Sequence, residues 1–289
     1  MKKSLSPRTH NWVTFLLAKF FLRKKARCFS YLLYSYFRKI DDFVDSPLND
    51  KKTLTEFING QKRMVEKFYA DSKTNGRSVI GRVIEYDLKN NRRLKSCIMK
   101  MFEVFEFDIE RKNKIVSEAQ LTGYSRNLSD SYTRLLLYFI EPRYECRQED
   151  VLLAHASHLA HMLRDLKEDK ELGYINISQE DMVGYKLQST DCSDSGFKEW
   201  LKVRVQLIKK YFKNAKKTLN KNPLLLIKLT GYLYSFRYET VIRQIEENGY
   251  VLKRRYLMRT RDIMRLVKEL AVLLLKHLWH NMYFFRTGC

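Results

Sequence analysis

The sequence has little proline, glycine or cysteine. Four prolines and ten glycines occur in 289 residues, and 30% of the residues are charged. Because helix-breaking residues are so scarce, we expect long helices. The five cysteines follow no metal-binding or disulfide spacing, which is typical of a reducing, cytoplasmic compartment; they are Cys28, Cys97, Cys146, Cys192 and Cys289.

The sequence also lacks a signal peptide and a long hydrophobic run. The apolar residues 12–22 are interrupted by Lys19 and are followed by basic residues, without a small-residue cleavage site. The apolar run 270–275 is too short to span a bilayer of about 30 Å. We expect a single domain over residues 1–289. For residues 270–289 two interpretations stay open: a last helix that caps the bundle, or a helix on a membrane surface.

Acidic residues are too few to balance the basic ones, and the formal net charge is +22. Such a charge suits nucleic acid, an anionic membrane or an anionic substrate. No nucleic-acid-binding motif accompanies it, so we expect no nucleic-acid partner. A solvated basic surface is the plain alternative. Peripheral contact with anionic lipid at the inner membrane face would contribute about 1 kcal/mol per basic group near the surface.

Two acidic motifs stand out against this basic background. Residues 155–169 contain no glycine or proline, and their Ala, Leu and Met positions predict a helix. On that helix Asp165 lies one turn from Glu168 and Asp169, with Cβ atoms about 5–6 Å apart. Carboxylates this close repel one another unless a cation lies among them, and Mg²⁺ prefers oxygen ligands.

The second acidic motif, in residues 36–46, has the same geometry. Asp41 and Asp45 form an i,i+4 pair on a helix that is otherwise aromatic and aliphatic, with Asp42 about 100° round its axis. An arginine precedes each motif: Arg38 and Arg164. If the two helices face each other, they form an anionic mouth that suits a diphosphate bridged to carboxylates by Mg²⁺.

These motifs resemble the squalene/phytoene synthase family, which joins two prenyl diphosphates head to head. The resemblance runs from about Phe15 to about Arg265 and includes a third signature near Tyr238 and Gly249-Tyr250. It implies an all-α, single-domain isoprenoid synthase bundle with a central apolar cavity. It does not decide whether NADPH is used, because the reductive members of the family also lack a glycine-rich dinucleotide motif.

The resemblance implies a role for each matched residue. The metal ligands for two or three Mg²⁺ ions would be Asp41, Asp42, Asp45, His161, Asp165 and Asp169. The diphosphate would bind to Arg38, Arg164, Tyr238 and Arg255. Catalytic roles would extend to Tyr34 and Tyr124. The cavity would be lined by Phe15, Tyr36, Ser129, Asp130, Tyr132 and His158.

The sequence departs from the family in two places. Residues 129–133 replace the small residues Ala-Gly-x-Val-Gly, so a carboxylate and extra bulk are expected in the cavity. His158 and His161 replace the family's Gln and Asn. An imidazole suits transition metals better than Mg²⁺. His161 is therefore interpreted as a metal ligand, as a hydrogen-bond donor to diphosphate, or as a packed histidine bonded to a neighbour.

Three functions stay open. The first is a head-to-head synthase that makes squalene, dehydrosqualene or phytoene. The second is ionisation of one prenyl diphosphate, with cyclisation or hydrolysis. The third is a non-catalytic relative, which the clustered carboxylates disfavour because buried charge is costly without a cation.

Overall fold

A computed structural model describes residues 22–71, 78–90, 93–188 and 195–286. Over these ranges the chain forms eleven helices and no strand, which confirms the all-α fold. The helices are α3 (Lys24–Val44), α4 (Lys51–Asp71), α5 (Val79–Leu88), α6 (Leu94–Arg111), α7 (Glu118–Ile140), α8 (Gln148–Arg164), α9 (Leu166–Glu171), α10 (Gln179–Gly184), α11 (Ser195–Leu219), α12 (Leu225–Glu247) and α13 (Thr260–Arg286).

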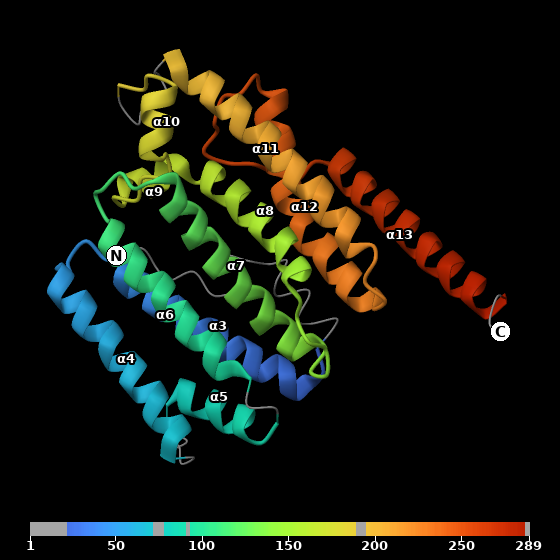
Figure 1. Ribbon diagram of the computed structural model, residues 1–289, viewed down its shortest axis with the longest axis horizontal. Coiled ribbons are helices and arrows are strands. Elements are labelled where there is room, and N and C mark those ends of the chain that lie inside the picture. Colours follow the sequence, from blue (N-terminus) through green and yellow to red (C-terminus); the bar gives the residue numbers. More distant parts are fainter. Residues whose placement is uncertain (1–21, 72–77, 91–92, 189–194, 287–289) are drawn as a thin grey trace.

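Helices α3 to α7 enclose one apolar cluster. The buried residues of α3 recur every three or four positions, as in Leu33, Phe37, Ile40 and Val44, so one face of this helix points inward. That face packs against α5, α6 and α7, while α4 covers α6 from outside (Figure 1). The first half of the chain thereby forms a wall of helices around the acidic motif of α3.

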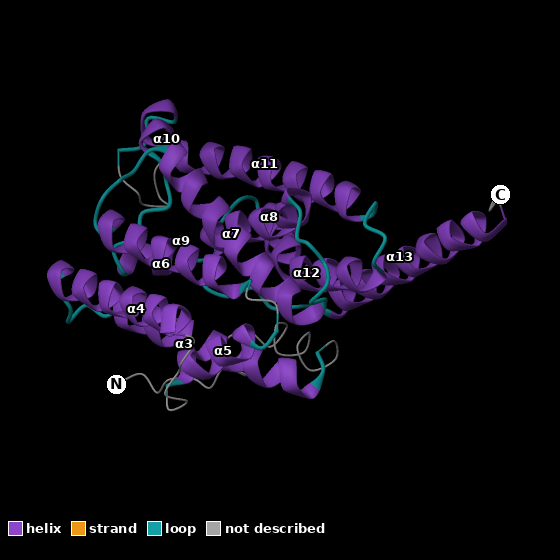
Figure 2. Cartoon of the chain, turned by 60° about the horizontal axis from the view of Figure 1, so that its bottom comes forward, coloured by secondary structure: helices purple, strands orange, loops and turns teal. Residues whose placement is uncertain are grey.

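Helix α8 lies at the centre of the second half. It packs against α7, α11 and α12, and Ala156 and Ala160 are fully buried, which lets neighbouring helices approach closely (Figure 2). Trp200 and Leu201 of α11 fill the second apolar cluster. Because α8 contacts α7 on one side and α12 on the other, it carries its acidic end between the two halves of the bundle.

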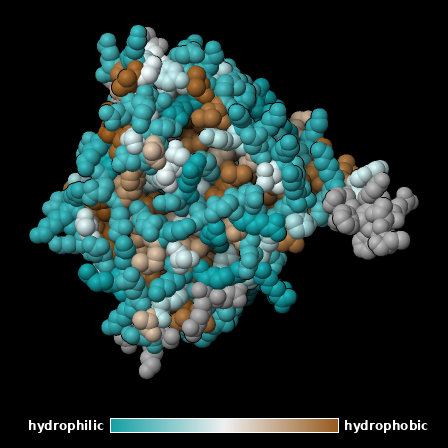
Figure 3. Space-filling model, in the orientation of Figure 1, coloured by the Kyte–Doolittle hydropathy of each residue, from teal (hydrophilic) through white to brown (hydrophobic). Residues whose placement is uncertain are grey.

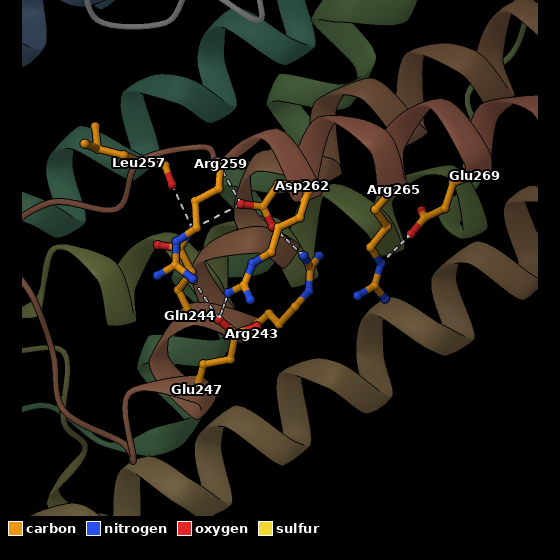
Figure 4. Close-up of polar contacts among 9 residues, drawn as sticks. Arg243, Gln244, Glu247, Leu257, Arg259, Asp262, Arg265 and Glu269 are labelled. Carbon is orange, nitrogen blue, oxygen red and sulfur yellow. Dashed lines mark hydrogen bonds and ion pairs between the residues drawn. The ribbon is translucent and has the colours of Figure 1, made fainter.

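Helix α13 is attached to α12 through a polar corner (Figure 4). Asp262, 1% exposed, accepts hydrogen bonds from the Arg243 guanidinium at 2.7 Å and from the Arg259 amide at 2.9 Å. Leu273 is buried against the bundle, but the later part of the helix projects away from it, with Leu275, Leu278 and Trp279 each more than half exposed (Figures 1 and 3).

None of the described helices is both long and apolar enough to cross a membrane. Over the described residues, helix α13 is packed on the bundle in its first part and exposed in its later part, and both interpretations of residues 270–289 stay predictions.

Candidate active site

The first acidic motif lies at the C-terminal end of α3. Arg38 bridges two carboxylates, with one guanidinium nitrogen 2.7 Å from Asp41 Oδ2 and the other 2.7 Å from Asp42 Oδ1. Asp45 follows directly as the C-cap. The last turn of a helix carries partial negative charge on its carbonyl groups, so carboxylates at this end are unfavourable unless a cation joins them.

The second acidic motif also ends a helix, which differs from the expected continuous helix through Asp169. Helix α8 ends at Arg164, and α9 begins at Leu166, with Asp165 between them in a non-helical conformation. The turn is nevertheless kept, because the Asp169 amide donates to the Asp165 carbonyl at 2.7 Å. Both carboxylates remain one turn apart, and Glu168 is exposed.

Both carboxylate oxygens of Asp165 are bonded to neighbouring side chains. The Arg164 guanidinium donates to both carboxylate oxygens at 2.5 Å, and His161 Nε2 lies 2.7 Å from Oδ2. Burial alone would raise the pKa of Asp165, but the hydrogen bonds from Arg164 and His161 outweigh it and hold that pKa below its usual range. His161 is thus bonded to a neighbouring carboxylate, and its expected roles as a metal ligand or as a hydrogen-bond donor to diphosphate stay predictions.

A third acidic group, Asp108 of α6, lies between the two motifs and was missed in the sequence. It accepts hydrogen bonds from Arg111 Nε at 2.7 Å and from the Tyr124 hydroxyl at 3.2 Å. Arg111 then donates to Asn176 Oδ1 at 2.9 Å, and Asn176 donates to Asp169 Oδ2 at 2.7 Å. This chain of hydrogen bonds connects α6 to the second acidic motif.

The carboxylates within each motif raise one another's pKa, and Asp108 acts on both motifs. Burial, followed by the nearby Asp45 carboxylate, raises the pKa of Asp41 to about 7 despite Arg38. Burial, followed by Asp165, raises the pKa of Asp169 to about 7. Burial also raises the pKa of Asp45 and of Asp108. The site therefore holds more negative charge than its arginines neutralise, and it is suited to a cation.

An apolar pocket of about 350 Å³ opens beside these carboxylates, between α3, α6, α7 and α8. Its polar end is formed by Arg38, Asp41, Asp108, Tyr124 and His161. The rest is aromatic and aliphatic: Leu22, Tyr31, Leu33, Tyr34, Phe37, Met101, Val104, Phe105, Leu128, Tyr132, Leu135, Leu136 and Phe139, with Ser30. The acidic mouth and the apolar pocket are thus parts of one site.

Among the described residues, no three His, Cys, Asp or Glu side chains are already arranged as a metal cluster. The donor set nevertheless fits a hard cation, because carboxylate oxygens dominate the mouth and the one imidazole at its rim is already bonded to Asp165. A metal ion bound by Asp41, Asp42 or Asp165 would compete with the guanidinium groups of Arg38 and Arg164, which are bonded to these carboxylates.

Four residues expected in the cavity do not line the pocket: Tyr36, Ser129, Asp130 and His158. Tyr36 is buried in the apolar cluster of α3 to α7, and its hydroxyl donates to Gln61 on α4 at 2.9 Å. Ser129 Oγ bonds the Ser125 carbonyl within α7. Asp130 is paired with Lys100 and Arg134, each at 2.7 Å, on the side of α7 that faces α6. The expected carboxylate in the cavity is corrected to a structural ion pair.

The histidines upstream of Asp165 form a separate cluster. Ser125 Oγ lies 3.0 Å from His155 Nδ1 and 2.9 Å from His158 Nδ1. The centroid of the His158 ring lies 5.4 Å from that of the Tyr124 ring and 6.1 Å from that of the His161 ring. His158 is not among the residues that line the pocket. Burial lowers the pKa of His158, so the ring is neutral at pH 7.

The remaining predicted residues divide between the site and its surroundings. Tyr238 is buried beside the mouth, with its ring centroid 5.9 Å from the Arg164 guanidinium and 5.9 Å from the His161 ring. Arg237, which the sequence analysis missed, is half-buried there, and burial and Arg164 lower its pKa. Arg255 is exposed in the segment after α12. Phe15 lies outside the described residues.

Comparison with known proteins adds a family to this geometry. The family model described as squalene/phytoene synthase matches residues 10–262. A search of curated proteins finds no match. Among solved structures, the chain is similar to squalene synthase HpnC from Alicyclobacillus acidocaldarius, with 17% identity, a TM-score of 0.67 and coverage of 85% of this chain and 92% of that one. It is also similar to a dehydrosqualene synthase in complex with ligand, with 16% identity, a TM-score of 0.70 and coverage of 92% and 93%. At these identities the structural likeness concerns the fold.

Proposed function

The chain belongs to the squalene/phytoene synthase family, and from this membership we propose that it condenses two prenyl diphosphates head to head, with release of pyrophosphate. The substrates would be farnesyl or geranylgeranyl diphosphate, and the product squalene, dehydrosqualene or phytoene. One observation carries the proposal: the polar end of a single apolar pocket contains Asp41 of the first acidic motif and His161, which is bonded to Asp165 of the second, and burial raises the pKa of both Asp41 and Asp169.

The mouth would bind the diphosphate through its carboxylates and arginines. Asp41, Asp45, Asp165 and Asp169 would hold two or three Mg²⁺ ions, which supply positive charge to the leaving pyrophosphate. The guanidinium groups would exchange carboxylate partners for phosphate oxygens, which accept the same bidentate geometry. These groups are Arg38 and Arg164, with Tyr238 beside them.

The pocket would then protect the reacting carbon atoms from water. Departure of pyrophosphate leaves an allylic cation, and the faces of aromatic rings attract such a cation. Tyr34, Phe37 and Phe105 line the pocket next to the acidic mouth. Because the rest of the lining is apolar, water is excluded and the cation can be captured by a second prenyl chain.

A second candidate function is favoured by the size of the pocket. Its volume of about 350 Å³ lies near the low end of the roughly 300–1,000 Å³ typical of small-molecule sites. That size suits one prenyl chain better than two. Ionisation of a single prenyl diphosphate, with cyclisation or hydrolysis, is therefore the alternative to condensation.

Helix α13 supports a further part of the proposal, peripheral contact with an anionic membrane. Its projecting part exposes Leu275, Leu278 and Trp279, and Lys268 and Lys276 lie on the same helix. An apolar stripe with basic neighbours is the pattern of an interfacial helix. Co-sedimentation with phosphatidylglycerol vesicles, but not with phosphatidylcholine vesicles, is expected. Unchanged co-sedimentation after Leu275→Glu with Leu278→Glu would contradict this role.

Incubation of the protein with each prenyl diphosphate and Mg²⁺, with and without NADPH, tests the function. Mass analysis of the hydrocarbon extract should show a product with twice the carbons of the substrate. A product with the carbon number of the substrate would select the single-substrate alternative. No pyrophosphate release from a folded protein with either substrate would support a non-catalytic relative.

A further inference from the structure

Tyr132 of α7 separates two cavities. One is the apolar pocket of about 350 Å³ described above, referred to here as the prenyl pocket. The other is a cavity of about 40 Å³ on the opposite side of the tyrosine, referred to here as the rear cavity. Tyr132 and Leu136 line both cavities, so these two side chains of one helix turn form the partition between them.

The ring of Tyr132 is held in place from α12. It stacks on the ring of Tyr234, with centroids 5.1 Å apart and planes inclined by 29°. Tyr234 in turn packs against Tyr238, with centroids 5.6 Å apart, beside the acidic mouth. Stacked aromatic pairs at such distances are favourable beyond their burial. The partition is therefore fixed to the same helix that carries Tyr238.

The rear cavity has a lining that a hydrocarbon chain would accept. Most of its wall is apolar, from Leu137, Leu153, Leu219 and Ile227, with Glu149 and Asp150 as the charged residues of the lining. Leu219 packs closely on Gly231, where a Cβ atom would lie 2.6 Å from it. At about 40 Å³ it holds only a few water molecules, since one water needs about 10–15 Å³ of such volume. It is too small to be a binding site alone and is useful only as an extension of the prenyl pocket.

We propose that Tyr132 is a specificity-determining residue that closes the prenyl pocket on the side of the rear cavity and so limits the length of the prenyl chain that fits. This inference rests on the proposed function, because it takes the ligand to be a prenyl diphosphate. Removal of the ring would join the rear cavity to the prenyl pocket and favour the twenty-carbon geranylgeranyl chain over the fifteen-carbon farnesyl chain.

The test measures binding of two non-ionising probes, farnesyl and geranylgeranyl thiolodiphosphate, to the full chain with Mg²⁺ by titration calorimetry. The ratio of the two Kd values is compared between wild type and three variants. Tyr132→Ala removes the partition, and Tyr132→Phe keeps it. Leu135→Ala enlarges the prenyl pocket from the same helix without reaching the rear cavity, because Leu135 lines only the former.

Tyr132→Ala should shift the Kd ratio toward the longer chain by about tenfold, since even one methylene group in a hydrophobic pocket changes selectivity by roughly 10–200-fold. Tyr132→Phe should stay within about twofold of wild type. Circular-dichroism melting identifies a variant that fails to fold, and Tyr132→Leu then replaces Tyr132→Ala as a smaller change with the same expected direction.

Three results would overturn the inference. An unchanged ratio in folded Tyr132→Ala and Tyr132→Leu would show that the ring does not limit chain length, while binding by wild type leaves the proposed function standing. An equal shift in Leu135→Ala would show that any added volume suffices. Failure of wild type to bind either probe would remove the proposed function and this inference together.

Discussion

The acidic mouth and the corner between α12 and α13 both contain buried aspartates, but these carboxylates differ in the hydrogen bonds that they receive. At the corner, Asp262 receives a guanidinium, a backbone amide and, at 3.5 Å, the Gln244 amide. At the mouth, Asp169 receives only the neutral amide of Asn176, and its pKa is raised to about 7. A buried carboxylate that is fully bonded stabilises a fold, whereas one that lacks a cation is suited to binding one.

The largest expected effect comes from removing a charge at the mouth. Asp41→Asn and Asp169→Asn should each lower the rate of pyrophosphate release by about a thousandfold, because the carboxylates supply metal-dependent stabilisation of the leaving group worth several kcal/mol. Steady-state pyrophosphate assays measure this loss. A decrease below about tenfold in both variants would show that the mouth is not the reaction centre.

The matching change at the corner should act on stability instead. Asp262→Ala leaves the half-buried Arg243 without its partner at 2.7 Å, and breaking a buried pair costs about 3–5 kcal/mol. Urea unfolding should show this loss. Arg243→Met in the same chain should restore part of it, because the uncompensated charge is then removed. Equal unfolding free energies for wild type and Asp262→Ala would refute the structural role of the corner.

The mouth should also make the metal-free protein sensitive to pH. Because the pKa of Asp169 is about 7 in the folded protein, the folded state keeps a proton that the unfolded state has lost near pH 4. The free energy of unfolding should therefore fall as the pH rises from about 4 to about 7, by at most about 1.4 kcal/mol per pH unit for this group, and should level off above pH 7.

The variant Asp169→Asn isolates that contribution. Its free energy of unfolding at pH 8 should exceed that of wild type by about 1–2 kcal/mol, less than the full shift implies because the carboxylate is partly solvated. Added Mg²⁺ should stabilise wild type more at pH 8 than at pH 6, when measured by thermal melting. Equal slopes of stability against pH in the two proteins would contradict the raised pKa of Asp169.

Features that depend on neighbours in the chain were predicted well. Helix α7 has local signals at both ends, since Ser117 forms a capping box with Gln120 at one end and Pro142 follows the other. Both acidic motifs were also predicted from local signals, namely the i,i+4 spacing of their aspartates and a preceding arginine. These signals are local and can be read without the fold.

Features that depend on which helix faces which were not predicted. Asp108 and Arg111 are an i,i+3 pair that looks like any surface pair until α6 is placed between the two acidic motifs. Asp130 and Tyr132 are two residues apart on α7, about 200° round the helix, so one faces Lys100 and the other the pocket. Periodicity identifies a face but not the element that covers it.

Asp130 gives the smallest expected effect and the sharpest contrast with Asp169. Its carboxylate lies 2.7 Å from both Lys100 and Arg134, and the hydrogen bonds of these two residues outweigh burial and lower its pKa. A lowered pKa contributes stability above the unfolded value, and that stability is lost as the pH falls through the folded pKa. At pH 7 the free energy of unfolding of Asp130→Asn should therefore be lower than that of wild type by about 0.5–1 kcal/mol, the range for partly exposed pairs.

The rate of pyrophosphate release by Asp130→Asn should stay within about twofold of wild type. The same Asp-to-Asn change would thus stabilise the protein at residue 169 and destabilise it at residue 130, and unfolding curves of the two variants side by side measure that difference in sign. A large loss of turnover in Asp130→Asn would instead show that the Asp130 carboxylate takes part in the reaction.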